Sequence, residues 1–453
     1  MAIERMRRAA VRRRPSSGWI DPAQLATRLA TARTLPELLE TRRRFAPEMD
    51  FSHAPVAWSR LARLRRRPAE RAWLDENLPF LEPLAAHTAE LVEQSEDIEA
   101  GRRAALASAL VAAGVRSEPP WNELWDAIER RSVESAPLSE CDECASVAEA
   151  LVNAGHSSQR YLEAAAPVVA RSLRREAGAR RGGAILLVRG RPVVDEVRLE
   201  CIAAFASALA RGAAASEDRS ALLGHLAAAA VPKVPAARAS HLVSLACTYG
   251  STPPPRAAAA GRDGAGGGGG SGSAGGGGGA SAAESAAQQS LLRAIADELR
   301  VRPWQLKPAE VALLAEVYCT RLPSGSAGGG EGGAAALVPS RGVVAVDSAP
   351  LLESLARVAL PRLDRYKAYN LARLAQAASR WPAAGGRGGS AAAEQLLSSV
   401  AAAAAAREGE FRGESRALLV DAYARARLLP PIQPEPAPPP LSTQPPRADR
   451  MII

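Results

Sequence analysis

The sequence contains few aromatic residues and few β-branched runs. Aromatic side chains make up only 4% of its 453 residues, although 47% of the residues are hydrophobic. Alanine and leucine supply most of the apolar mass, and both are strong helix formers. Because strands are enriched in β-branched and aromatic residues, this composition argues against a sheet and favours helices that pack closely through small side chains.

Lysine is also scarce. Lys233, Lys307 and Lys367 are the only three, so arginine supplies nearly all of the positive charge behind the formal net charge of +9. A basic surface attracts phosphate backbones, which makes RNA a candidate partner. A GC-rich codon bias would also raise the content of arginine, alanine, glycine and proline, and it is the alternative explanation of this composition.

Sequence signatures of catalysis, metal binding and membrane insertion are missing. Five cysteines are too few for a disulfide framework, and the CxxC of Cys141 and Cys144 lacks the second ligand pair of a structural zinc site. The five histidines are scattered, and no nucleotide-binding or nucleophile motif occurs. No apolar run approaches the roughly 20 residues that cross a bilayer. We therefore predict no catalytic residue, no cofactor, no metal and no membrane contact.

Pairs of helices recur along the whole chain. Residues 35–64 read as a helix, a short break and a second helix that ends on a face of small residues. Similar second-helix endings, spaced 36 to 69 residues apart, begin at Leu61, Leu110, Leu151, Leu209, Leu245, Leu314, Leu374 and Leu419. Degenerate helix pairs of roughly 35–45 residues are typical of a solenoid. The sequence therefore predicts an all-α fold, an α-solenoid of about eight helix-turn-helix repeats with disordered Gly-rich insertions.

Composition divides the chain into five segments. Residues 1–17 hold six arginines and one acidic residue, Glu4, a pattern typical of a mitochondrial presequence; a disordered basic tail or an RNA-binding arm is the alternative. We expect a presequence at 1–20, a helical-repeat block at 21–251, a disordered Gly/Ser/Ala-rich linker at 252–288, a second block at 289–428 with a flexible insertion at 323–338, and a disordered Pro-rich tail at 429–453.

Several local features place helices within the first block. The second pair is expected near residues 74–93 and 98–113, and Gly114 and Gly155 are natural residues to follow a helix. Trp121 and Trp125 share one helix face, where core anchoring is favoured over base stacking. After Leu173 we expect an insertion that is dense in arginine.

Two arginine clusters are the candidate RNA contacts. The first follows the helix that ends at Leu64, where positive charge also complements the helix dipole, so solvent exposure beside a helix end is the alternative role. The second lies in the expected insertion. The candidates are Arg63, Arg65, Arg66, Arg67, Arg174, Arg175, Arg180 and Arg181.

The second-helix pattern resembles that of degenerate helical-repeat RNA-binding proteins of organelles. The pattern occurs in residues 50–64, 306–315 and 371–377. The similar families are the octotricopeptide and heptatricopeptide repeat proteins, the Fas-activated serine/threonine kinase-like proteins and the helical-repeat subunits of the RNA-editing substrate-binding complex. The sequence departs from these families in that a proline–tryptophan opening occurs once, at residues 119–121, and no RAP domain follows, so no nuclease-like activity is implied.

The resemblance implies an RNA-binding protein of the mitochondrial matrix. Its partners would be mitochondrial transcripts or ribosomal RNA, together with other subunits of an RNA-processing or ribosomal complex, and its role RNA processing, editing or stability. The alternative is a protein–protein scaffold, such as a structural subunit of a mitochondrial ribosome, because the concave surface of a solenoid serves either use.

Overall fold

The computed structural model describes residues 20–95, 100–182, 187–188, 191–192, 197–212, 217–251, 278–320, 349–381 and 390–432. The expected presequence lies outside these residues except for Ile20. The expected insertion at 323–338 and the tail from residue 433 onward also lie outside them.

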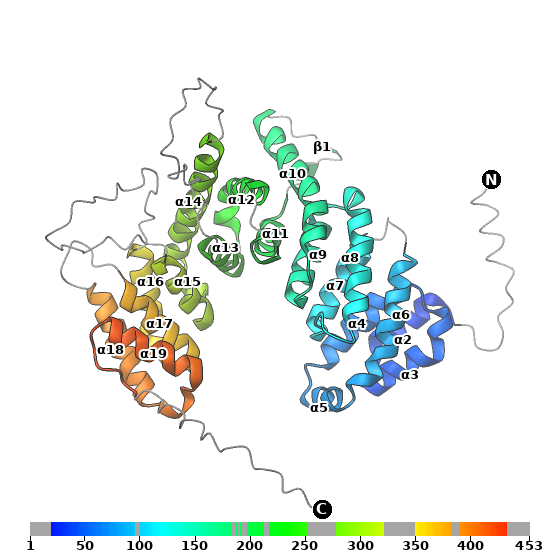
Figure 1. The fold of residues 1–453 in the computed structure, drawn as a ribbon, viewed down its shortest axis with the longest axis horizontal. Coiled ribbons are helices and arrows are strands. Elements are labelled where there is room, and N and C mark those ends of the chain that lie inside the picture. Colours follow the sequence, from blue (N-terminus) through cyan, green and yellow to red (C-terminus); the bar gives the residue numbers. More distant parts are fainter. Residues whose placement is uncertain are drawn as a thin grey trace, which may run out of the picture. The chain divides into compact units, whose positions relative to one another are not determined.

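The described part of the chain is an all-α fold, as predicted (Figure 1). A hairpin of two-residue strands, β1 (Leu187–Val188) and β2 (Arg191–Pro192), pairs antiparallel between two helices. Short 3-10 turns join the two helices of most pairs, and proline occupies most of these turns. Because proline cannot donate the backbone hydrogen bond of a continuing helix, it ends the first helix of a pair.

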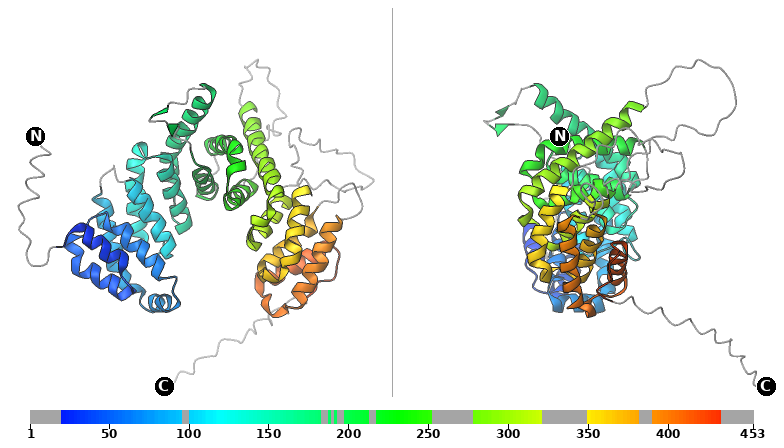
Figure 2. Two further views of the ribbon diagram at one scale, coloured as in Figure 1. Left: turned by 180° about the vertical axis from the view of Figure 1, so that it is seen from behind. Right: turned by 90° about the vertical axis from the view of Figure 1, so that its left-hand side faces the viewer.

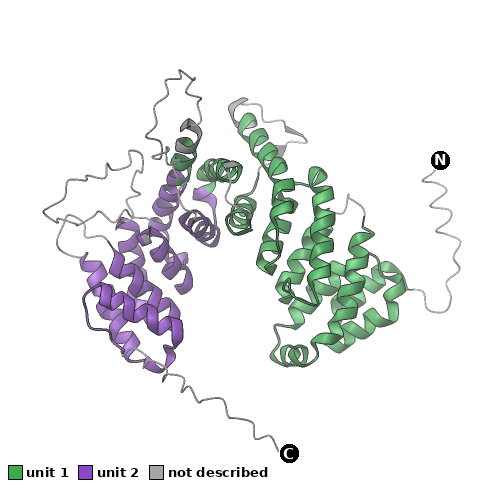
Figure 3. Ribbon diagram, viewed as in Figure 1, with its two compact units in different colours: residues 1–233, 255–288 green, residues 234–254, 289–453 purple. Residues whose placement is uncertain are grey.

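Contacts divide the chain into two compact units, residues 1–233 with 255–288 and residues 234–254 with 289–453 (Figure 3). The division falls between Lys233 and Val234, whereas the expected linker begins at residue 252. Unit 1 contains α2 (Pro22–Thr31), α3 (Leu35–Phe45), α4 (His53–Leu64), α5 (Pro68–Glu76), α6 (Glu82–Glu93), α7 (Ala100–Ala113), α8 (Asn122–Ser135), α9 (Cys141–Ala154), α10 (Gln159–Gly182), α11 (Leu199–Gly212) and α12 (Glu217–Ala230).

The core of unit 1 lies between consecutive helices of the same kind. Among the second helices, α4 packs on α7, α7 on α9 and α9 on α11, while among the first helices α6 packs on α8, α8 on α10 and α10 on α12. Leucines and alanines at helical spacing fill these contacts, and Leu61, Leu110 and Leu151 are fully buried. The scarcity of aromatic residues is compatible with this packing because small side chains let the helices approach closely.

Unit 2 repeats this arrangement (Figures 1 and 2). It contains α13 (Ala239–Ser251), most of α14 (Gly278–Val301), α15 (Pro308–Thr320), α16 (Ala349–Ala359), α17 (Ala368–Arg380), α18 (Ala391–Ala405) and α19 (Gly413–Arg425). Here α13 packs on α15, α15 on α17 and α17 on α19. The 3-10 turns η6 (Pro303–Gln305) and η7 (Leu360–Arg365) join α14 to α15 and α16 to α17.

The two predicted glycine helix ends are confirmed. Gly114 follows α7 with φ of 78°, and Gly155 follows α9 with φ of 77°. At both ends the amide of the next residue bonds back to a leucine carbonyl, from Val115 to Leu110 and from His156 to Leu151, each at 3.0 Å. This backbone pattern needs the left-handed conformation that glycine adopts without steric cost.

Three expected boundaries differ from the structure. The helix expected at 74–93 is divided into α5 and α6 by the turn η2 (Leu78–Leu81), because prolines at 79 and 83 interrupt helical hydrogen bonding. The expected insertion after Leu173 is the continuation of α10 to Gly182, since alanine, arginine and glutamate favour a helix. The last part of the expected linker, residues 278–288, is the beginning of α14, where alanine again dominates.

Candidate nucleic-acid interface

The arginines at the end of α4 do not form one surface patch. Arg65 is half-buried and donates a hydrogen bond of 2.5 Å to the carbonyl oxygen of Ala113, the last residue of α7. Arg67 donates a bond of 2.9 Å to the carbonyl of Arg33, beyond the end of α2. Within the described residues, the exposed side chains of Arg63 and Arg66 form no hydrogen bond and no ion pair. Of the four arginines, these two therefore have no partner among the described residues.

The second candidate cluster lies on α10. Arg174 and Arg175 are exposed, and Arg174 Nε lies 3.3 Å from the carbonyl of Ala170 in its own helix. Arg180 and Arg181 belong to the last turn of α10, but their side chains lie outside the described part of the structure. Arg174 and Arg175 are thus two exposed cations on one helix.

Arginines elsewhere in unit 1 bind the carbonyl ends of α2, α9 and α11. Arg60 donates to the carbonyl of Ala32, after α2, at 2.6 Å, and Arg219 donates to Ala210 of α11 at 2.9 Å. Arg116 donates to the carbonyl of Asn153 in the last turn of α9. A helix C-terminus carries partial negative charge and unpaired carbonyls, so these guanidinium groups satisfy it. The sequence did not single out these three residues.

The net charge of the helical units limits their overall electrostatic attraction for RNA. The first 17 residues carry a net charge of +5, which leaves +4 of the overall +9 for residues 18–453. Because the helical units have little excess charge, any RNA binding by them depends on local arginines rather than on their overall field.

Trp121, directly before α8, and Trp125 within it belong to the core, as predicted. Trp125 is fully buried and Trp121 is 6% exposed. The ring of Trp121 contacts that of Trp58 edge-on, with centroids 6.4 Å apart. These indoles are therefore closed to nucleic-acid bases, whereas Phe80 of η2 and Trp304 of η6 are 65% and 60% exposed.

The cysteine pair is buried in α9. Burial raises the pKa of the Cys141 thiol to about 12 and that of Cys144 to about 11. The thiolate is the form that binds zinc and attacks disulfides, and these surroundings disfavour it. Within the residues that the structure describes, no group of three or more His, Cys, Asp or Glu side chains is placed to hold a metal ion.

One polar cluster could not be predicted from the sequence, because its members lie far apart along the chain. His156 Nδ1 lies 2.9 Å from Ser117 Oγ, and its Nε2 lies 3.3 Å from a carboxylate oxygen of Glu129. The amide of Ser117 also donates to the carbonyl of Ala154 at 2.8 Å. Together these bonds fasten the loop before α8 to the end of α9.

No protein-family model matches the chain, and no curated protein is significantly similar to it. None of the described helices is both long enough and apolar enough to cross a membrane.

Proposed function

We propose that the chain is an α-solenoid that binds single-stranded RNA, acting in the processing, editing or stability of mitochondrial RNA. The solenoid is supported by the rows of second helices, α4 to α11 in unit 1 and α13 to α19 in unit 2, in which each helix packs on the next one. Repeats that contact only their neighbours are the defining property of a solenoid.

A recurring tertiary hydrogen bond gives independent support for the repeats. Tyr318 of α15 donates its hydroxyl to the carbonyl of Leu292 in α14, at 2.7 Å. Tyr423 of α19 donates to Leu397 of α18, at 2.5 Å, and in both cases the partners are 26 residues apart. The same buried hydrogen bond thus occurs at the same sequence spacing in two helix pairs of unit 2.

RNA binding is carried by the guanidinium groups of Arg63 and Arg66, which are exposed and have no partner within the described residues. Guanidinium groups bind phosphate oxygens through two parallel hydrogen bonds. Arg174 and Arg175 of α10 offer a second pair of charges. The arginines of the first 17 residues, if they direct import, bring the chain to the mitochondrial matrix.

The test is the affinity of the purified full chain for a labelled single-stranded RNA, measured by fluorescence anisotropy over a range of salt concentrations. Arg63→Ala/Arg66→Ala should weaken binding about tenfold at physiological salt. It should also reduce the slope of log K against log salt by about 1.4, because each phosphate contact on a single strand contributes about 0.7. The double variant Arg357→Ala/Arg365→Ala removes two exposed arginines of unit 2 and is the charge-matched control. An affinity that the wild-type chain keeps at high salt contradicts the proposal.

A protein scaffold is the second candidate, favoured by a face of unit 2 with paired charges. Arg373 Nε lies 3.3 Å from a carboxylate oxygen of Glu316 and stacks 4.6 Å from the ring centre of Tyr369. The hydroxyl of Tyr369 donates to Glu414 at 3.4 Å. Because Arg373 already has an anionic partner in Glu316, this face attracts phosphates weakly. It is better suited to contact another protein.

Crosslinking in native cells separates the two candidates. RNA recovered with the tagged protein after ultraviolet irradiation should come from mitochondrial messages or guide-type RNAs. Footprints confined to ribosomal RNA favour a ribosomal scaffold, and the absence of crosslinked RNA favours a protein partner.

A further inference from the structure

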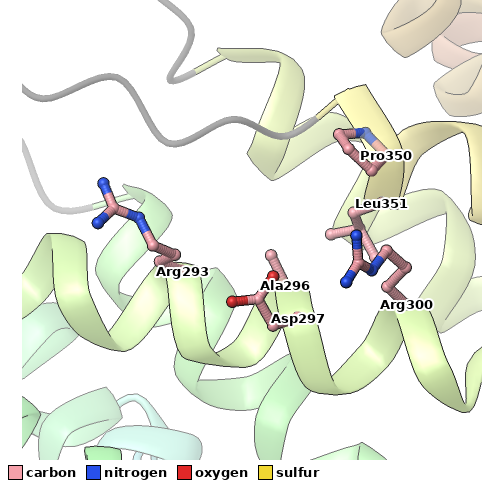
Figure 4. Close-up of a pocket in the computed structure, with 6 residues that line it drawn as sticks. All are labelled: Arg293, Ala296, Asp297, Arg300, Pro350 and Leu351. Carbon is pink, nitrogen blue, oxygen red and sulfur yellow. The ribbon is translucent and has the colours of Figure 1, made fainter.

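A small hollow opens on unit 2 between α14 and α16 (Figure 4). Its volume is about 140 Å³. The hollow is lined by charged residues of α14 and apolar residues of both helices, namely Arg293, Ala296, Asp297, Arg300, Pro350 and Leu351. Within the described residues, the exposed side chains of the two arginines and the aspartate form no hydrogen bond and no ion pair.

The charges lie along one face of a well-anchored helix. Arg293, Asp297 and Arg300 are spaced i, i+4 and i+7, and Figure 4 places Asp297 between the two arginines. At 1.5 Å per residue the two arginines are about 10 Å apart along the helix. On the opposite face Ile295 and Leu299 are fully buried, so the charged face is held in place by the core.

An exposed aromatic side chain follows on the same segment. Trp304 belongs to η6, which begins two residues after α14 ends, and it is 60% exposed. Single-stranded nucleic-acid sites combine exposed aromatic rings, on which bases stack, with cations that follow the backbone.

We propose that α14 and η6 form a second RNA site, in which Arg293 and Arg300 bind phosphates, Asp297 accepts a hydrogen bond from a ribose 2′-hydroxyl, and Trp304 stacks on a base. The inference rests on the RNA binding proposed above and adds its contact in unit 2. The hollow is smaller than the roughly 300 Å³ at which pockets begin to enclose a whole small molecule. It therefore suits one sugar–phosphate unit of a strand that passes across the surface.

The aspartate favours RNA over other anionic partners. The carboxylate repels every anionic partner, RNA phosphates included, but it accepts a hydrogen bond from a hydroxyl group, which the backbone of DNA and the side chains of an acidic peptide lack. The 2′-hydroxyl is the group by which a protein distinguishes RNA from DNA. Asp297 would thus determine specificity while the arginines supply affinity.

The first experiment measures binding of the full chain to labelled RNA by anisotropy. Arg293→Ala/Arg300→Ala should weaken binding about tenfold and reduce the salt slope by about 1.4, with Arg357→Ala/Arg365→Ala as the charge-matched control in the same unit. Trp304→Ala should weaken binding about fivefold or more. If the wild-type chain binds RNA and these variants bind like the control, the site in unit 2 is refuted and the proposed function stands.

The second experiment compares RNA with DNA of the same sequence. Asp297→Ala removes a negative charge, so the affinity of this variant for RNA and for DNA should rise. Its preference for RNA over DNA should nevertheless fall about fivefold, because a charge-assisted hydrogen bond to the 2′-hydroxyl is lost. An unchanged RNA-to-DNA ratio refutes the role of Asp297. If the wild-type chain binds no RNA but binds a polyglutamate peptide through Arg293 and Arg300, both proposals fail and the hollow belongs to an acidic protein partner.

Discussion

The guanidinium group of Arg65 binds the carbonyl oxygen of Ala113 across 2.5 Å, and so joins the end of α4 to the end of α7. Gly114 follows directly, and a Cβ atom added to it would collide with the guanidinium group. The arginine therefore occupies the space that the missing side chain of Gly114 leaves. This contact connects two successive helix pairs, which gives Arg65 a structural role.

Replacement of Arg65 should lower stability, whereas replacement of Arg63 should not. Arg65→Ala removes a half-buried hydrogen bond from a charged donor and should cost about 1–2 kcal/mol. Arg63→Ala should stay within about 0.5 kcal/mol, as is usual for exposed side chains without partners. Urea unfolding followed by circular dichroism measures both. Equal destabilisation by the two variants would show that Arg65 has no special structural role.

Gly114 and Gly155 form a matched pair for testing the same contact. Both have φ near +77°, but an added Cβ meets nothing within 4 Å at Gly155. Gly155→Ala should therefore cost only the left-handed backbone strain of about 1–2 kcal/mol. Gly114→Ala should cost more, because it also displaces Arg65.

A double-mutant cycle isolates the added cost at Gly114. In the presence of Arg65→Ala, the change Gly114→Ala should cost only about as much as Gly155→Ala, because no guanidinium group remains to be displaced. Strictly additive effects of the two changes would contradict the proposed steric coupling.

Local features of this fold could be predicted from the sequence, and contacts between repeats could not. The ends at Gly114 and Gly155 depend on backbone conformations that glycine favours, and helix pairs depend on local propensity and apolar spacing. The partner of Arg65 is a carbonyl 48 residues away, and nothing in the sequence distinguishes Arg65 from its neighbour Arg63. Arg65 and Arg67, half of the first candidate cluster, therefore have tertiary hydrogen bonds that the sequence could not show.

Composition alone could not predict the length of α10 or the buried partner of Glu176 within it. The sequence predicts an insertion, dense in arginine, after Leu173, but the segment continues α10, in which Glu176 is 5% exposed. Only the fold shows that this carboxylate has a buried cation beside it. That cation is Lys233, one of the three lysines of the chain.

The buried pair of Lys233 and Glu176 should be essential to unit 1. Lys233 Nζ lies 2.6 Å from a carboxylate oxygen of Glu176, with side chains 7% and 5% exposed. Lys233→Met leaves the carboxylate without its cation and should cost about 3–5 kcal/mol. The double variant Lys233→Met/Glu176→Leu should recover much of that loss, because an apolar pair carries no buried charge. Thermal unfolding checks both, and a double variant less stable than Lys233→Met would contradict the argument.

His87 should make stability depend on pH. Burial in α6, together with the nearby charge of Arg42, lowers the pKa of this imidazole below its ordinary value of 6.5, although Glu90 opposes the shift. The unfolded chain therefore binds a proton more readily than the folded chain does. The contribution of His87 to stability is complete above pH 6.5 and is lost as the pH falls from there toward the lower folded pKa.

The urea concentration at the unfolding midpoint should therefore decrease as the pH falls from about 7 to about 5, and His87→Asn should reduce that decrease. His225→Asn, which changes an exposed histidine of α12, is the control and should keep the full decrease. If His87→Asn and His225→Asn show the same pH profile, the decrease has another origin.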